Sequence, residues 1–208
     1  MDAAMSRSMP AAPVSDVSYP IRVELEASNK IARWRVFAHF FMAIPHFIIN
    51  NALQMLFGAV TFIAFFAILF TKKYPEGLFR FAVMAQRYNW RVTSFALFMR
   101  EQYPAFEFQM ELEDPASDPA RYSAEYPAEL NRWLPLVKLF LAIPHLFVLI
   151  ALMIGGIFVM FASFFAVLFT GKYPEGMRDY MVGVTRWYQR VGAYVGLMTD
   201  RYPPFSLQ

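Results

Sequence analysis

The chain contains no cysteine among its 208 residues. Disulfide bonds, thiolate metal sites and cysteine nucleophiles are therefore excluded. The sequence also lacks a Ser/His/Asp arrangement, a P-loop, a dinucleotide-binding glycine pattern and any metal-ligand spacing. Its apolar half has no acid–base pair of the kind that hydrolysis needs. We therefore expect a protein that is not an enzyme, with no catalytic residue, no metal site and no required cofactor.

Charged residues are scarce as well. They make up 17% of the chain and hydrophobic residues 58%, whereas typical soluble domains are about 25% charged. Two stretches have no Asp, Glu, Lys or Arg: 36 residues from Val36 to Thr71 and 33 residues from Leu139 to Gly171. An apolar run of about 18 residues or more is typical of a membrane span. The sequence thus predicts an integral membrane protein, and its net charge of +3 is too small to indicate a nucleic-acid partner.

The chain contains an internal repeat at a fixed offset of 99 residues, which maps residues 33–106 onto the second half without a gap. Phe66-Ala-Ile-Leu-Phe-Thr-Lys-Lys-Tyr-Pro-Glu-Gly77 recurs as Phe165-Ala-Val-Leu-Phe-Thr-Gly-Lys-Tyr-Pro-Glu-Gly176. One offset held through such rare strings indicates two tandem units. We divide the chain into a flexible tail (1–18), unit 1 (19–113), a linker (114–125) and unit 2 (126–208).

Each apolar segment is too long for one upright crossing. As a single helix it would measure about 54 Å, against a hydrocarbon core of about 30 Å. We therefore predict an all-α membrane fold in which each segment folds back as a helical hairpin, over residues 31–72 and 130–171. The expected turns lie between Asn50 and Gly58 and at Gly155-Gly156.

Two further elements are expected in each unit. Alternating apolar and charged residues predict short β-strand arms at Tyr19–Glu26 and Phe106–Glu113, with a third at residues 205–208. Tyr-Pro-Glu-Gly then opens a helix over residues 75–100, and again over 174–199, each with a stripe of arginines. Two arginines at mid-bilayer would cost at least about 2.5–3.5 kcal/mol each, so we expect these amphipathic helices to lie in the membrane interface.

The basic residues indicate orientation and a lipid site. Under the hairpin model all 19 Lys and Arg residues lie on one side of the membrane, and an excess of positive charge is typical of the cytoplasmic side. Both termini are therefore expected there. The candidate headgroup ligands are Lys72, Lys73, Arg87, Arg91, Lys172, Arg186 and Arg190. The alternative is that these groups pair with neighbouring carboxylates.

His46 and His145 occupy matching positions after a proline, inside the uncharged segments. The simplest interpretation is that each imidazole caps a carbonyl left unpaired by the proline. The alternatives are a bis-histidine site for haem b or a proton-relay pair. Asn50, Asn51 and Gln54 have no polar counterpart in the second unit and are interpreted as turn residues, with a polar pathway as the alternative.

The combined pattern of Arg33-Trp34, Ala43-Ile-Pro-His46 and Leu-Phe-Thr-x-Lys-Tyr-Pro-Glu-Gly resembles a bacterial membrane family catalogued as domain of unknown function 4389, here in two copies. The resemblance implies a bacterial inner-membrane protein and implies no reaction. We expect an accessory or scaffolding protein that associates with other membrane subunits and with anionic lipid. The alternatives are a small transporter or channel at the repeat or oligomer interface, and a haem-binding redox subunit.

Overall fold

The computed structural model describes residues 19–208, so the tail expected over residues 1–18 lies outside the described residues. The fold is mostly helical, as predicted, with one two-stranded sheet. Its elements, in chain order, are β1 (Ile21–Leu25), α1 (Arg35–Thr71), α2 (Glu76–Ala96), β2 (Ala120–Ala124), α3 (Leu134–Thr170) and α4 (Glu175–Val195).

The predicted hairpins are wrong: α1 and α3 are each one continuous helix of 37 residues. Neither expected turn contains a proline, and a glycine inside a helix costs only about 1 kcal/mol. Gly58 and the Gly155-Gly156 pair are therefore accommodated without a break. The prolines inside the helices, Pro45 and Pro144, lie in the first third of each.

Both long helices end in the same way. The residue after each helix, Lys72 or Gly171, has a positive φ of 60° or 69°. Each then accepts a hydrogen bond across the molecule: the Ile31 N–H donates to the Gly171 carbonyl (3.1 Å) and the Leu130 N–H to the Lys72 carbonyl (2.8 Å). Ile31 and Leu130 are themselves 99 residues apart, so the two bonds are equivalent.

The sheet lies on the pseudo-two-fold axis of the repeat. β1 and β2 pair antiparallel, and the central pair joins Val23 to Tyr122, its equivalent at the 99-residue offset. One face of the sheet is buried, whereas the other carries Arg22, Glu24 and Arg121 toward solvent. Charged residues therefore occupy the outer face of the sheet at the centre of the molecule.

Two of the three predicted β-strand arms are not strands. Residues 106–113 and 205–208 are not strands but irregular segments, and strand β2 lies inside the stretch expected as a linker. The reason is that the backbone carbonyls of these segments accept hydrogen bonds from arginine side chains instead of from a neighbouring strand, as described below. The N-terminal arm is a strand, as predicted.

The two units exchange their strands. β1 begins unit 1 but packs on α4 of unit 2, whereas β2 packs on α2 of unit 1. Equivalent hydrogen bonds hold both contacts: Arg186 Nε donates to the Val23 carbonyl (3.0 Å) and Arg87 Nε to the Tyr122 carbonyl (3.1 Å). The units are therefore intertwined rather than arranged as separate domains.

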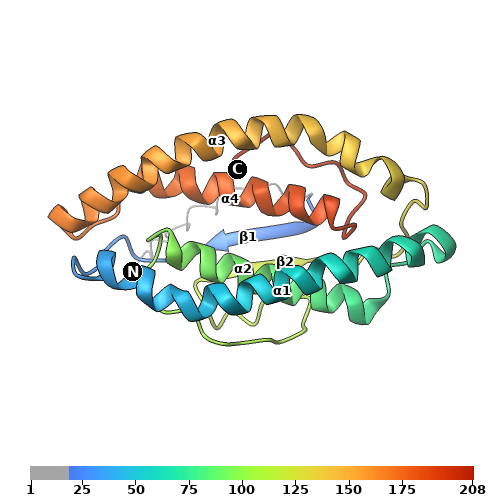
Figure 1. Cartoon of the computed structure of the whole chain (residues 1–208), viewed down its shortest axis with the longest axis horizontal. Helices are drawn as coiled ribbons and strands as arrows, with labels where there is room; N and C mark the ends of the chain where they lie inside the picture. The colour runs from blue at the N-terminus through green and yellow to red at the C-terminus, as the bar shows by residue number, and fades with distance from the viewer. Residues whose placement is uncertain (1–18) are drawn as a thin grey trace, which may run out of the picture.

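The helices form two antiparallel layers around the sheet. α1 packs on α2 and α3 on α4, and the beginning of α1 contacts the end of α3, where the Phe37 and Phe164 rings lie 5.7 Å apart. Figure 1 shows α3 along one long edge of the molecule and α1, crossed by α2, along the other, with α4 and β1 between them. α2 and α4 are thus enclosed by the outer helices and the sheet.

Most of the surface of α1 and α3 is apolar and exposed. A single stripe is buried on each helix, which on α1 includes His39, Ala43 and His46. Large side chains such as Phe40 (63% exposed) and Phe147 (71% exposed) cover the remaining faces. By length and composition both helices could cross a membrane, and only 17% of the most apolar window of each is buried.

Candidate functional site

The two matching histidines are buried, each in an aromatic pocket of its own unit. His46 Nδ1 lies 2.7 Å from the Tyr88 hydroxyl, and Phe106 stacks on the imidazole at 4.3 Å. In unit 2 Trp187 Nε1 donates to His145 Nδ1 at 3.1 Å, and Phe205 stacks at 4.0 Å. Tyr88 corresponds to Trp187, and Phe106 to Phe205, at the 99-residue offset.

This geometry corrects the expected carbonyl caps, because the partner of each imidazole is a side chain on the neighbouring helix. The indole N–H of Trp187 can only donate a hydrogen bond. Nδ1 of His145 therefore accepts it, and the neutral imidazole carries its proton on Nε2. A haem between His46 and His145 would have to displace the stacked rings from both pockets. The histidines therefore act as packing groups that join α1 to α2 and α3 to α4.

Arg87 and Arg91 were expected at lipid headgroups, but both are buried, 3% and 1% exposed. Arg87 donates to the carbonyls of Gln109 and Glu111 and pairs with Asp114 at 3.1 Å. Burial lowers the pKa of the Arg87 guanidinium, and the charge of Asp114 opposes that shift. These contacts tie the irregular segment 106–114 to α2, which explains why it needs no strand partner.

Arg91 completes the same cluster. It pairs with Asp114 at 3.2 Å and with Glu107 at 2.9 Å. Hydrogen bonds from Ser117 and then from Arg91 lower the pKa of the Glu107 carboxyl. The alternative of pairing with carboxylates therefore holds for this stripe, and the headgroup prediction at Arg87 and Arg91 is wrong because both face inward.

The arginines of unit 2 likewise contact backbone oxygens. Arg186 donates to the carbonyls of Val23 and Leu207, and Arg190, 5% exposed, donates to a backbone oxygen of Gln208 at 2.6 Å. The C-terminal segment is thereby fastened along α4. These two arginines also face protein rather than a membrane surface, which corrects their assignment as headgroup ligands.

The remaining headgroup candidates, Lys72, Lys73 and Lys172, are exposed at the ends of the long helices. Each end of the molecule combines a lysine of one unit with an Arg-Trp pair of the other. Arg33 lies against Gly171, next to Lys172, and Lys72 shares a surface hollow with Arg132 and Trp133. The structure therefore groups basic and aromatic residues at both ends.

The polar residues Asn50 and Gln54 lie inside helix α1 and not in a turn, which corrects their interpretation. Gln54 Nε2 donates to the Ala85 carbonyl at 3.3 Å, and Asn89 Nδ2 donates to Asn50 Oδ1 at 3.3 Å. Gln189 of α4 then donates to Asn89 Oδ1 at 2.9 Å. These amides link α1, α2 and α4 across the middle of the molecule. Asn51 is exposed on α1.

Several functional contacts were missed from the sequence. Tyr88 and Trp187 stand at matching positions, so the repeat register identifies them as equivalents but does not show that they contact the histidines. No such signal exists for Arg100 and Asp118, a buried ion pair whose counterparts are Thr199 and Tyr19. Among residues 19–208 no group of three or more His, Cys, Asp or Glu side chains could hold a metal ion.

Comparison with known proteins identifies the repeat. A family model described as Domain of unknown function (DUF4389) matches residues 33–107 and again residues 132–206. No curated protein and no solved structure is significantly similar to the chain. The matched segments contain both histidine pockets and all four helices found in residues 19–208. The chain therefore belongs to the DUF4389 family and carries two tandem copies of its domain.

Proposed function

We propose that this protein is a non-enzymatic membrane scaffold that lies flat in one leaflet of a bilayer. The apolar surfaces of α1 and α3 would face the hydrocarbon, and the charged outer face of the sheet would face water. The observation that carries this proposal is the exposed apolar surface along two 37-residue helices, beside a central sheet that is charged on its outer face.

The length of the helices favours the flat orientation. The charge-free stretch of α1, Val36–Thr71, is about 54 Å long. Keeping it within a hydrocarbon core of about 30 Å would require a tilt of about 55°. Membrane-spanning helices tilt by about 20° on average and stay below about 40°. A helix lying in the plane of the leaflet has no such length limit.

The position of the sheet favours the same orientation. Because α1 and α3 are antiparallel, a spanning arrangement would place the pseudo-two-fold axis, and the sheet on it, at the depth of the bilayer centre. Arg22, Glu24 and Arg121 would then lie there, at a cost of about 2.5–3.5 kcal/mol for a charged side chain. In the flat orientation the axis is perpendicular to the membrane and these residues remain in water.

The ends of the molecule fit a headgroup layer. Trp34 (62% exposed) and Trp133 (65% exposed) stand at the starts of α1 and α3, and tryptophan is enriched at membrane interfaces. The adjacent Lys72, Lys73 and Lys172 would each contribute about 1 kcal/mol of attraction to anionic lipid. These three lysines remain our proposed headgroup ligands.

We further propose that the scaffold serves a larger complex in a bacterial inner membrane, with both termini on the cytoplasmic side. In the flat orientation all basic residues lie on one side, which is the distribution typical of cytoplasmic segments. The buried polar groups described above are engaged in contacts within the chain, which supports a structural role. The pockets of His46 and His145 favour neither a haem subunit nor a proton relay.

Cysteine labelling tests the orientation directly, because the natural chain has no cysteine. Single variants Lys73→Cys, Lys172→Cys, Glu125→Cys and Asn51→Cys would be treated with a membrane-impermeant maleimide in spheroplasts and in inverted vesicles. We expect the first three to react in the same preparation and in only that one. Asn51→Cys, on the exposed face of α1, should react only after detergent is added.

The alternatives give different patterns. A spanning orientation would make Lys73→Cys and Lys172→Cys react in opposite preparations, because these residues follow the ends of two antiparallel helices. Rapid reaction of Asn51→Cys without detergent would show that α1 is covered by neither lipid nor a partner. Either result would overturn the proposed orientation.

A further inference from the structure

The two units differ at one position where the long helix packs against its neighbours, which is Phe57 in α1 and Gly156 in α3. In unit 1 the ring of Phe57, on α1, fills the space beside Gly196, the residue after α4, so closely that a Cβ there would lie 2.5 Å from the ring. In unit 2 the equivalents of these residues are Gly156 and Leu97. In unit 2 the long helix α3 therefore has a glycine where α1 has Phe57. Leu97 is too small to fill the volume that the Phe57 ring fills in unit 1.

A cavity of about 300 Å³ occupies this place in unit 2. Its walls come from three helices: Thr93 of α2 and Leu97 just after it, Gly156 and Met160 of α3, and Thr185 of α4, together with their neighbours. Small-molecule sites in proteins have volumes of about 300–1,000 Å³. The equivalent space in unit 1 is filled by Phe57 and by a hydrogen bond between Gln86 and Gln54.

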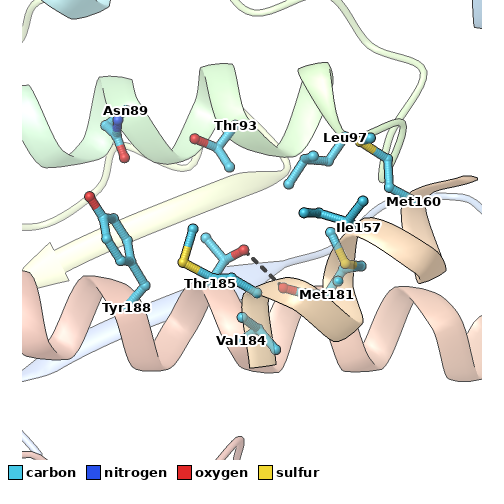
Figure 2. A pocket seen from close by; sticks show the side chains of 11 residues that line it. Asn89, Thr93, Leu97, Ile157, Met160, Met181, Val184, Thr185 and Tyr188 are labelled. Atoms are coloured by element: carbon cyan, nitrogen blue, oxygen red, sulfur yellow. Dashed lines mark hydrogen bonds between the residues drawn. The ribbon is translucent and has the colours of Figure 1, made fainter. Parts of the chain in front are cut away.

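The cavity has a polar end and an apolar end. Figure 2 shows Asn89 and Tyr188 facing each other at one end, whereas Leu97, Met160 and Met181 surround the other. None of the lining residues is charged. Within residues 19–208 the Tyr188 hydroxyl has no hydrogen-bond partner. This lining suits a molecule with an uncharged polar group, such as an ester, and an apolar chain.

The cavity is open toward the proposed lipid-facing surface. Met153 (52% exposed) and Ile157 (51% exposed) line it and also belong to the exposed apolar face of α3. Tyr188, at the polar end, is 50% exposed. A hydrocarbon chain from the surrounding leaflet could therefore enter without crossing a polar barrier. This step rests on the flat membrane orientation proposed above.

We propose that the cavity beside Gly156 binds one acyl chain of a membrane lipid, with the ester group near Asn89 and Tyr188. Methionine side chains are flexible and fill irregular apolar space around a bound chain, and Met153, Met160 and Met181 line this cavity. Only unit 2 provides the site, because Phe57 fills its equivalent in unit 1.

Photolabelling in vesicles tests this proposal. The protein would be reconstituted with a phosphatidylcholine that carries a diazirine in one acyl chain, irradiated and digested, and the labelled residues identified by mass spectrometry. We expect labels on cavity residues of α2 and α4, such as Thr93 and Met181, in addition to the outer faces of α1 and α3. Gly156→Phe should abolish the cavity labels, and Ala151→Phe, on the exposed face of α3, should leave them unchanged.

Gly156→Phe should fold, because a Cβ at Gly156 meets only the Met181 thioether, at 3.5 Å, and circular dichroism checks this. A second variant, Phe57→Ala, guards against a misfolded Gly156→Phe protein. It opens the equivalent space in unit 1 and should add labels on Gln86 or Gly196. Labels on the outer faces alone, identical in all variants, would overturn the acyl site while preserving membrane insertion. No label on any residue would overturn the membrane proposal itself.

Discussion

Arg100 and Asp118 form an ion pair whose side chains are 0% and 2% exposed. The pair joins the segment after α2 to the start of β2, and Asp118 also accepts a hydrogen bond from the Ala120 N–H at 2.8 Å. Burial lowers the pKa of Arg100, and the charge of Asp118 opposes that shift. At the scale of single residues, this chain places charge inside the protein to fasten segments that lack regular structure.

We predict that Asp118→Ala destabilises the protein by about 3–5 kcal/mol, because it leaves the buried Arg100 charge without its neutralising carboxylate, although the hydrogen bond from Arg100 to the Arg91 carbonyl remains. Thermal unfolding in a mild detergent, followed by circular dichroism, measures the change. Glu125→Ala is the matched control: it breaks the Arg22–Glu125 pair, whose side chains are 59% and 66% exposed, and should cost less than about 1 kcal/mol. Equal effects of the two variants would contradict the structural role of the buried pair.

The candidate residues could be predicted from the sequence only in part. The repeat register identified His46 and His145 as equivalents, but no local pattern showed that Tyr88 and Trp187 would bind them. The arginine stripes were recognised as a helix face, yet their partners lie in segments whose carbonyls carry no sequence signal. Gly156 is visible as the equivalent of Phe57, but the cavity appears only when α2, α3 and α4 are placed together.

At the scale of elements, the ends of α1 and α3 offer a comparison within one chain. Both helices are followed by a residue with positive φ, which is glycine in unit 2 and Lys72 in unit 1. The left-handed conformation costs a residue with a side chain roughly 1–2 kcal/mol. Thr71 and Thr170 form the same hydrogen bonds at both ends, so the difference between Lys72 and Gly171 can be tested in isolation.

Lys72→Gly should therefore stabilise the protein by about 1 kcal/mol, because glycine adopts positive φ without strain. Gly171→Ala should destabilise it by a similar amount, and no close contact at Gly171 adds to that cost, since its nearest neighbour lies at 3.7 Å. Lys73→Gly is the control, because its φ is not positive. Chemical denaturation gives the three values, and a stabilisation equal in Lys72→Gly and Lys73→Gly would point to loss of charge instead.

The element type was predictable and the course of the long helices was not. The apolar composition of residues 35–71 is compatible with one long helix and equally with two shorter helices. The predicted hairpin followed only from the assumption that the segment crosses the membrane upright. β1 was predicted from alternation, which its single buried face explains. β2 was missed because Pro115 and Pro119 precede it and its sequence, Ala-Arg-Tyr-Ser-Ala, is only weakly apolar.

At the scale of the whole molecule, the exchanged strands make each unit dependent on the other. The Tyr19 hydroxyl donates to the carbonyl of Arg190 at 3.4 Å, 171 residues away, and the bonds from Ile31 and Leu130 cross between the units as well. We predict that residues 1–116 and 117–208, co-expressed as separate chains, purify as one complex, and that neither half is stable alone.

Size-exclusion chromatography with a tag on one half measures this association. As a control, Glu24→Pro in the first half removes a ladder hydrogen bond, because Glu24 lies in the same phase of the strand as Glu26, whose N–H donates to the Pro119 carbonyl across the sheet, and proline has no N–H to donate. This variant should reduce recovery of the second half. Independent, monodisperse folding of both halves would contradict the exchange of strands.

The exchange also determines the order of events while the chain is being synthesised. β1 leaves the ribosome before α4, against which it packs and which is completed about 170 residues later. At about 5–20 residues per second this interval lasts roughly 10–30 s. Until β2 emerges, about 95 residues after β1, β1 is a strand without a sheet, and such edges favour aggregation. α1 emerges next, so its early insertion into the membrane would hold the nascent chain in place until its second half arrives.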